Sequence, residues 1–206
     1  MAERMIEHGS FVIAVGRRKN RLDEFAAKHG PDKVATSQFD VTYMDGIKST
    51  SYVALLAAFL PHLQRQNWPV LWGETAAVIA VSSSLAIVPL PSCANHCATK
   101  AALHSLMWSL RAQFAADPGS RHIRVVEIVP PPTELPELQD DLRVGFAHIG
   151  ITIEEYMRDD CWAGLERGDL EIHIEPIATS FLGLEDRRRA KFHGFMNDIA
   201  TGRLPK

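Results

Sequence analysis

The chain has 206 residues, of which 46% are apolar and 23% are charged, with a net charge of −3 and an isoelectric point of about 6.3. This length and composition fit one globular domain over residues 1–206, and the acidic balance argues against a nucleic-acid-binding surface, which is usually basic. The longest apolar run, Val53 to Leu60, is much shorter than the roughly 20 residues that a membrane span needs.

The N-terminus and the cysteines favour a cytoplasmic protein. Residues 1–10 are charged and polar and lack the apolar segment of a secretory signal. The three cysteines form no disulfide framework, which favours a reducing compartment. Cys93 and Cys97 lie four positions apart with His96 between them, but no second ligand pair follows at a zinc-like spacing. We therefore predict no metal site.

Short apolar runs alternate with amphipathic stretches along the whole chain. In chain order they predict a strand over 10–16, a helix over 17–29, a strand over 33–40, a helix over 47–66, a strand over 76–82, a helix over 95–114, a strand over 122–129, a helix over 153–167, a short strand over 171–175 and a helix over 185–200. Because the inner strands are apolar on both faces, this order predicts a parallel sheet covered by helices on both sides.

Three stretches together resemble the short-chain dehydrogenase/reductase family. They are residues 12–22 followed by 40–42, residues 81–106, and residues 123–135. Residues 150–172 resemble the end of the DltE-like subgroup of this family. The resemblance implies an α/β fold, a Rossmann-like doubly wound parallel sheet, that binds a nicotinamide dinucleotide at the carboxyl ends of its strands.

Two parts of the family pattern are missing from the sequence. No glycine triplet matches the turn that follows the family's first strand, and residues 1–9 resemble the end of the helix after that turn. A helix and the fourth strand are missing between Asp45 and Ile47. The predicted sheet therefore lacks its first and fourth strands, so the strands over 10–16 and 76–82 either pair anew or leave the domain unstable.

The resemblance assigns candidate cofactor contacts. Arg17 stands where a guanidinium meets the adenosine 2′-phosphate, which favours NADP over NAD. Asp40 and Val41 match the pair that flanks the adenine, and Thr133 matches a threonine near the nicotinamide amide. The alternative for Arg17 is a solvated residue at a basic helix start.

The resemblance also assigns a catalytic group. Lys100 fixes the register and matches the family lysine, which also binds the cofactor; Ser83 matches the serine, and His96 stands in place of the tyrosine. The family's helix asparagine falls at Lys48. The non-catalytic alternatives are that Ser83 belongs to a turn or a helix cap and that His96 is a helix-start residue without a role.

Exchanging tyrosine for histidine changes the proton chemistry. A tyrosine titrates near pH 10, and an adjacent ammonium brings it toward the working pH. An imidazole titrates near pH 6.5, and the same ammonium favours its neutral form. His96 is therefore expected to be a base or a hydrogen-bond donor and a poor proton source, so ketone reduction suffers most.

Three functions remain open from the sequence. The first is an impaired NADP(H)-dependent oxidoreductase that acts on a carbonyl or alcohol of a small organic molecule. The second is a cofactor-independent isomerase, dehydratase or cyclase that uses the same pocket. The third is a non-catalytic interaction protein, or pseudoenzyme. The resemblance further implies that the helix over 95–114 forms a homodimer interface.

Overall fold

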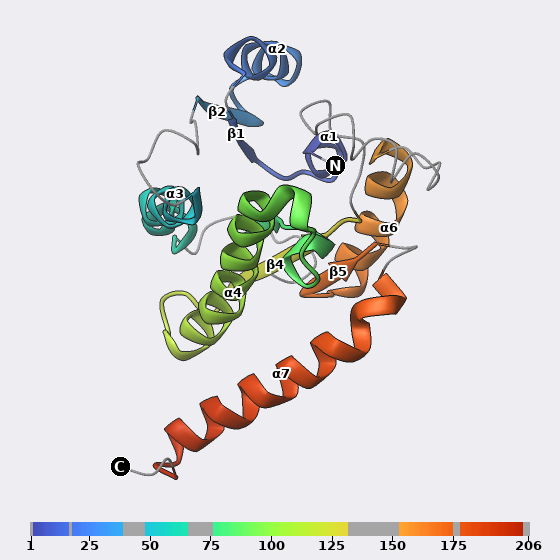
Figure 1. The fold of residues 1–206 in the computed structure, drawn as a ribbon. Helices are drawn as coiled ribbons and strands as arrows, with labels where there is room; N and C mark the ends of the chain where they lie inside the picture. The colour runs from blue at the N-terminus through green and yellow to red at the C-terminus, as the bar shows by residue number, and fades with distance from the viewer. Residues whose placement is uncertain are drawn as a thin grey trace.

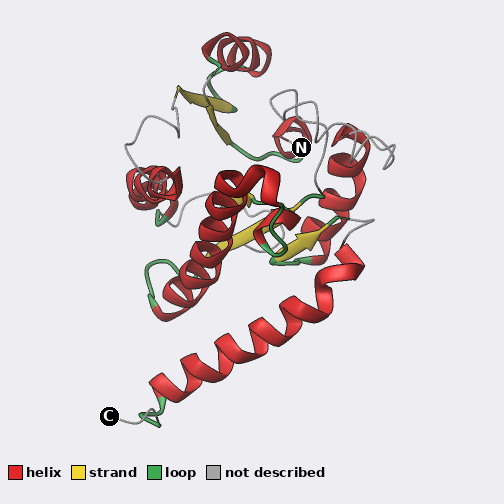
Figure 2. Cartoon of the chain, viewed as in Figure 1, coloured by secondary structure: helices red, strands yellow, loops and turns green. Residues whose placement is uncertain are grey.

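The computed structural model describes residues 2–16, 18–38, 48–65, 76–131, 153–174 and 178–203. Strands and helices alternate along these segments, as Figures 1 and 2 show. The elements are α1 (Ala2–Glu7), β1 (Val12–Gly16), α2 (Lys19–His29), β2 (Val34–Gln38), α3 (Lys48–Leu63), β3 (Ala76–Val81), the short 3₁₀ helices η1 (Ser84–Ala86) and η2 (Pro91–Cys93), α4 (Ala94–Ala116), β4 (Ile123–Val129), α6 (Ile153–Arg167), β5 (Glu171–His173) and α7 (Ala178–Ala200).

The larger sheet has the strand order β3-β4-β5, and both of its pairings are parallel. The central strand β4 pairs Ile128 with Val81 on one side and with Ile172 on the other. Nearly every residue of β4 is buried, as the apolar sequence of a strand covered on both faces predicts. The candidate site lies at the carboxyl ends of the strands of this sheet.

The second sheet contains only β1 and β2, which pair in parallel from Val12 opposite Val34 to Gly16 opposite Gln38. The sequence left open whether β1 and β3 pair with each other, and among the described strands they do not. The described strands instead form two separate parallel sheets, and α1 lies beside the start of β1 near α6 (Figure 1).

Two apolar clusters cover the two faces of the larger sheet. On one face α4 and α3 pack on alternate residues of β4, including Val125. On the other face α6 packs on the intervening residues, including Val126 and Ile128. At Gly164 of α6 an added Cβ would lie 2.8 Å from the side chain of Ile172 in β5, so only glycine allows this close approach.

Helix α1 connects the two sheets through side chains. Met5 packs against the cluster under α6. The Arg4 guanidinium lies 4.7 Å from the centre of the Trp162 ring of α6, and the His8 ring lies at the same distance on that indole. In the other direction Glu3 accepts a hydrogen bond from Lys28 of α2 at 2.6 Å. Among the described residues, α1 thus contacts both the helix that covers the small sheet and the cluster under α6.

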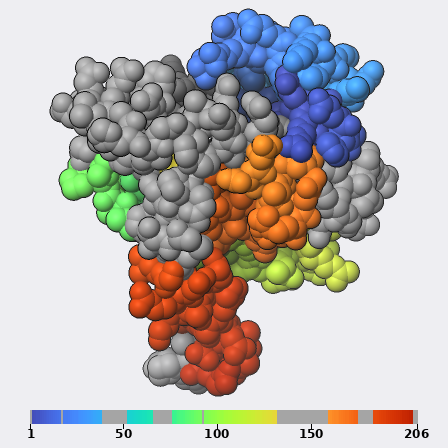
Figure 3. All heavy atoms as spheres, turned by 90° about the vertical axis from the view of Figure 1, so that its right-hand side faces the viewer, coloured from blue at the N-terminus to red at the C-terminus, as the bar shows by residue number. Residues whose placement is uncertain are grey.

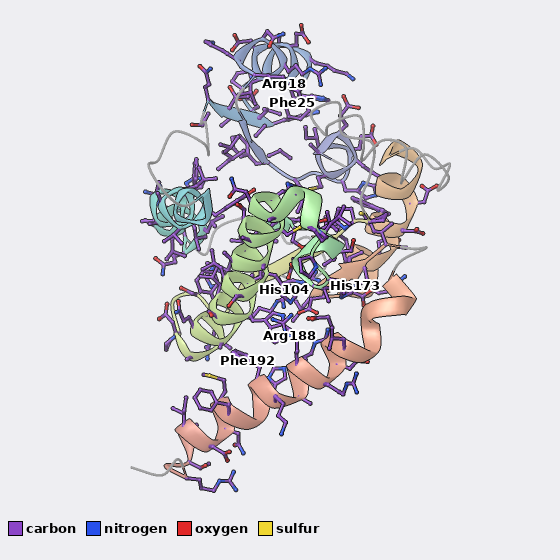
Figure 4. The ribbon with its side chains drawn as sticks, in the orientation of Figure 1. Arg18, Phe25, His104, His173, Arg188 and Phe192 are labelled. Carbon is purple, nitrogen blue, oxygen red and sulfur yellow. The ribbon has the colours of Figure 1, made fainter. Side chains whose placement is uncertain are left out.

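Helix α7 begins at Ala178, seven residues earlier than predicted, and its C-terminal half projects from the body (Figure 3). Residues 178–184 include a threonine, a serine and a glycine, which have low helix propensity, so periodicity alone missed this first part. Near the middle of α7, the Phe192 ring lies 5.4 Å from the Trp108 ring of α4, measured between ring centres. The Arg188 guanidinium carbon lies 5.3 Å from the centre of the same indole (Figure 4). The middle of α7 therefore packs on α4.

Most predicted elements are confirmed within a few residues, because their periodic patterns are local. The apolar face of the predicted 95–114 helix packs inside the chain, with Leu103, Met107 and Phe114 buried against the sheet. The homodimer predicted through this helix stays a prediction.

Candidate active site

The candidate site lies at the carboxyl end of β3, where the chain continues beside β4. The Ser82 N–H donates to the Ile128 carbonyl, and the Ser84 N–H donates to the Pro130 carbonyl, both at 2.9 Å. These bonds extend the strand pairing past the end of β3. They hold the serine run in a fixed and buried backbone position.

Ser83 is the N-cap of the short helix η1. Its Oγ accepts a hydrogen bond from the Leu85 N–H at 3.2 Å, and its side chain is buried. The predicted cap role is therefore present. It uses the oxygen as an acceptor and leaves the hydroxyl proton for another partner, so the cap is compatible with a role toward a ligand.

Lys100 reaches the end of β3 from helix α4. Its Nζ donates a hydrogen bond to the Val81 carbonyl at 2.7 Å, two residues before Ser83. Burial lowers the pKa of Lys100, and the negative charge of Glu127 opposes this effect. The structure thus brings the ammonium to the strand end that carries the serine.

His96 lies one helical turn before Lys100 on α4. Residues four positions apart lie on the same face of a helix, so these two side chains share a face. His96 is half-buried in the first turn of α4, just after η2. The three predicted catalytic residues therefore come from two adjoining elements, the β3–η1 junction and the start of α4.

The predicted cofactor contacts Arg17, Asp40, Val41 and Thr133 lie outside the described residues. Next to Arg17, Arg18 is the exposed N-cap residue of α2 and makes no side-chain cap bond (Figure 4). The carboxyl end of β1 is thus followed by a basic helix start.

Sequence reasoning missed a buried ionic group beneath the site. The carboxylate of Glu127 in β4 lies 2.9 Å from Nδ1 of His104 in α4, and the other ring nitrogen lies 2.9 Å from Glu185 of α7. All three side chains are almost fully enclosed. The signal in the sequence was an acidic residue within the buried run HIRVVEIV, since a buried carboxylate requires partners.

The carboxylates set the charge of His104. Burial by itself lowers the pKa of His104, but hydrogen bonds to Glu127 and Glu185 outweigh it and raise the pKa to about 9. The ring is then an imidazolium that donates from both nitrogens. Since Glu127 also acts on Lys100, this group links the candidate site to the docking of α7.

A second ionic cluster surrounds Glu171 of β5. It accepts hydrogen bonds from Trp108 at 2.6 Å and from Arg111 at 2.5 Å, and it also pairs with Arg189 of α7. Burial opposes ionisation, but His173 and the two guanidinium groups lower the pKa of Glu171. This cluster again fixes α7 to α4.

Within the described segments, no group of three or more His, Cys, Asp or Glu side chains is arranged to hold a metal ion. In the same segments, no helix has both the length and the apolar character to cross a membrane.

Comparison with known proteins agrees with the sequence pattern. The sequence model of the family described as short chain dehydrogenase matches residues 44–144. The uncharacterized oxidoreductase DltE of Bacillus subtilis is 29% identical over 248 residues, which covers 98% of this chain and 91% of that protein. Because 248 exceeds the 206 residues of this chain, the relative contains segments that this chain lacks.

Solved structures share the fold. A short-chain dehydrogenase from Sphingobium yanoikuyae in complex with NADPH has a TM-score of 0.62 at 20% identity, covering 96% of this chain and 89% of its own. A short-chain dehydrogenase from Burkholderia cenocepacia in complex with NADP has a TM-score of 0.58 at 19% identity, covering 90% and 97%. The bulky-bulky ketone specific alcohol dehydrogenase from Comamonas testosteroni has a TM-score of 0.61 at 17% identity, covering 93% and 87%.

The α/β fold with its parallel strands is the fold of the solved short-chain dehydrogenases. The chain is similar to the short-chain dehydrogenase/reductase family in its sequence over residues 44–144 and in its fold. Its family match includes Ser83, His96, Lys100 and Thr133 and begins after Arg17, Asp40 and Val41.

Proposed function

We propose that this chain slowly interconverts a carbonyl and an alcohol of a small organic molecule with NADP(H), using Ser83, His96 and Lys100. The observation that carries the proposal is the bond from Lys100 Nζ to the Val81 carbonyl, which fixes the ammonium at the strand end that carries Ser83. By the resemblance, the serine at this strand end binds the substrate oxygen.

The described residues fit the nicotinamide end of such a cofactor. Lys100 spends one of its three N–H donors on Val81, which leaves two for ribose hydroxyls. The buried hydroxyl of Ser84 has no hydrogen-bond partner among the described residues, although buried polar groups are normally paired. An orphaned hydroxyl beside Ser83 supports a ligand at this strand end.

The sequence lacks the usual binding site for the pyrophosphate of a dinucleotide. A dinucleotide phosphate is usually bound by backbone N–H groups of a glycine-rich turn, and no such glycine triplet occurs in this sequence. Basic residues at the start of α2, with Arg17 before it and Asp40 and Val41 after β2, are proposed to hold the adenosine end. We therefore expect weak cofactor binding.

Each of the three residues has a distinct proposed role, and the bound dinucleotide supplies or accepts the hydride. The Ser83 hydroxyl donates a hydrogen bond to the substrate oxygen, since its own oxygen is occupied by Leu85 N–H. Lys100 holds the ribose, and His96 gives or takes the substrate proton. Because an imidazole titrates near pH 6.5, reduction is proposed to be slow above that pH.

Cofactor binding to the purified chain tests the proposal. We expect calorimetry to show NADPH binding in the micromolar range and Lys100→Met to weaken it about tenfold, the effect of losing one hydrogen bond to a charged group. Lys191→Met, an exposed lysine of α7, is the matched control and should bind normally. Absence of binding at millimolar NADPH, in a chain shown to be folded, overturns the proposal.

The missing glycine triplet and the histidine at position 96 favour a second candidate, a cofactor-independent proton-transfer enzyme such as an isomerase, dehydratase or cyclase. An imidazole one helical turn from an ammonium can remove a proton next to a carbonyl without a dinucleotide. Proton–deuterium exchange into small ketones that depends on His96 and proceeds without NADPH would select this candidate.

A further inference from the structure

Two thiols lie side by side at the start of α4. Cys93 is the N-cap residue of this helix, and Cys97 lies in its first turn. Their Sγ atoms are 3.6 Å apart and both cysteines are free. A disulfide requires the sulfur atoms to approach by about a further 1.5 Å, and rotation about the side-chain bonds can supply this movement.

The two thiols have different surroundings. Cys97 is buried, accepts a hydrogen bond from the Leu90 N–H at 3.3 Å, and has its Sγ 3.6 Å from the Leu90 carbonyl oxygen. Cys93 is partly exposed. A dissolved oxidant therefore reaches Cys93 first, while Cys97 is held next to it and shielded from direct attack.

Cys161 provides the contrast within the same chain. It is fully buried in the cluster under α6, and burial together with the nearby Asp160 raises its pKa to about 11. Since the thiolate is the reactive form and access is required, Cys161 should stay reduced under conditions that oxidise the pair.

We propose that Cys93 and Cys97 form a reversible dithiol–disulfide modification site that reacts with hydrogen peroxide. Cys93 attacks the peroxide, its sulfur is oxidised to a sulfenic acid, and the O–O bond breaks with release of water. The Cys97 thiol then attacks that sulfur, the S–S bond forms, and the hydroxyl of the sulfenic acid leaves as a second water. Two thiols and one hydrogen peroxide thus give one disulfide and two water molecules.

The bond encloses the candidate active-site residue. Residues 94–96 lie between the two cysteines, so the disulfide restrains the backbone on both sides of His96. Burial and the neighbouring Cys97 thiol raise the pKa of Cys93, so the oxidation is slow at neutral pH and accelerates as the pH rises. The site does not depend on dinucleotide binding, and its test does not involve activity.

Thiol counting and peptide mapping test this site directly. Trypsin places Cys93 and Cys97 together in the peptide 66–100 and Cys161 in the peptide 159–167. The folded chain is treated with hydrogen peroxide, then denatured and alkylated. We expect the number of alkylated cysteines to fall from three per chain to about one. Peptide 66–100 should lose two hydrogen atoms, and dithiothreitol should restore them.

Two variants complete the experiment. Cys93→Ser changes only the partly exposed thiol and should abolish the loss of two hydrogens, whereas Cys161→Ser, the matched control, should leave it unchanged. Three alkylated thiols after treatment would overturn the proposal. So would stable sulfinic acid at Cys93 without a bridge, or an equal yield of the bridge from the urea-unfolded chain, because the fold would then contribute nothing.

Discussion

His104 and Glu185 are 81 positions apart in the chain, yet the Nε2 atom of the histidine lies 2.9 Å from a carboxylate oxygen of the glutamate. Glu127 occupies the other ring nitrogen, and Arg188 pairs with the outer oxygen of Glu185 at 2.7 Å. The imidazolium therefore joins β4, α4 and α7 at a point enclosed from solvent. It explains why the inner end of α7 stays on the body while its outer half projects.

Removal of the imidazolium should destabilise the fold strongly. In His104→Gln the two buried carboxylates lose the positive charge between them, and such a loss typically costs about 3–5 kcal/mol. Urea unfolding, followed by tryptophan fluorescence, measures the change. His193→Gln on the exposed face of α7 is the control, with an expected change below about 0.5 kcal/mol. Equal stabilities of the two variants would contradict the buried charge.

Stability should fall on the alkaline side because of the same residue. The pKa of His104 is about 9 in the folded chain against 6.5 for an ordinary histidine. The contribution of His104 to the free energy of unfolding is complete below pH 6.5 and is lost as the pH rises through 9. The shift in its pKa corresponds to on the order of 3 kcal/mol. The pKa of Glu185 is lowered despite its burial, by His104 and Arg188, so this carboxylate instead loses its contribution in acid.

Urea unfolding at pH 6, 7.5 and 9 checks this dependence. The free energy of unfolding should decrease steadily across the series for the natural chain and much less for His104→Gln. A flat profile for the natural chain would show that His104 is neutral in the fold.

Glycine at position 164 should be required for the contact between α6 and β5. An alanine there brings its Cβ to 2.8 Å from Ile172, and overpacking of this kind costs about 1–3 kcal/mol. Gly194→Ala is the matched control, because it lies on the exposed part of α7 with open space around it. This control should stabilise the chain by up to about 1 kcal/mol, the difference in helix propensity. Thermal unfolding should show a lower midpoint temperature for Gly164→Ala and an unchanged or higher one for Gly194→Ala.

Restoring a phenol at position 96 should raise reductase activity if proton supply limits the reaction. Positioned acid–base groups contribute about 10²- to 10⁴-fold to rates, so we expect His96→Tyr to increase kcat with NADPH and a panel of small ketones by at least about tenfold. His96→Phe differs from it by one hydroxyl and should show no gain. The same low activity in both variants would place the limitation in cofactor binding instead.

The predicted secondary structure was largely correct because each element depends on local patterns. The strand over 122–129 and the helix over 153–167 appear in the structure as Ile123–Val129 and Ile153–Arg167. Family spacing also placed Ser83 and Lys100, and the structure holds both at one strand end. The roles of these residues, of His96 and of the proposed cofactor contacts stay predictions.

The pairing of the strands could not be read from the sequence. Backbone hydrogen bonds form between any two strands that meet, so the pattern left open whether β1 and β3 join. The structure separates them into two sheets, and side chains of α1, above all Met5 and Arg4, make the connection.

The sequence by itself determined the periodic elements and the resemblance to the family, because both depend on residues near one another in the chain. Only the tertiary structure decided that Glu127, His104 and Glu185 form one buried ionic group and that Cys93 and Cys97 lie in contact. Such contacts depend on how helices settle on a sheet, and a buried charge becomes stable only where that packing brings its partner within hydrogen-bond distance.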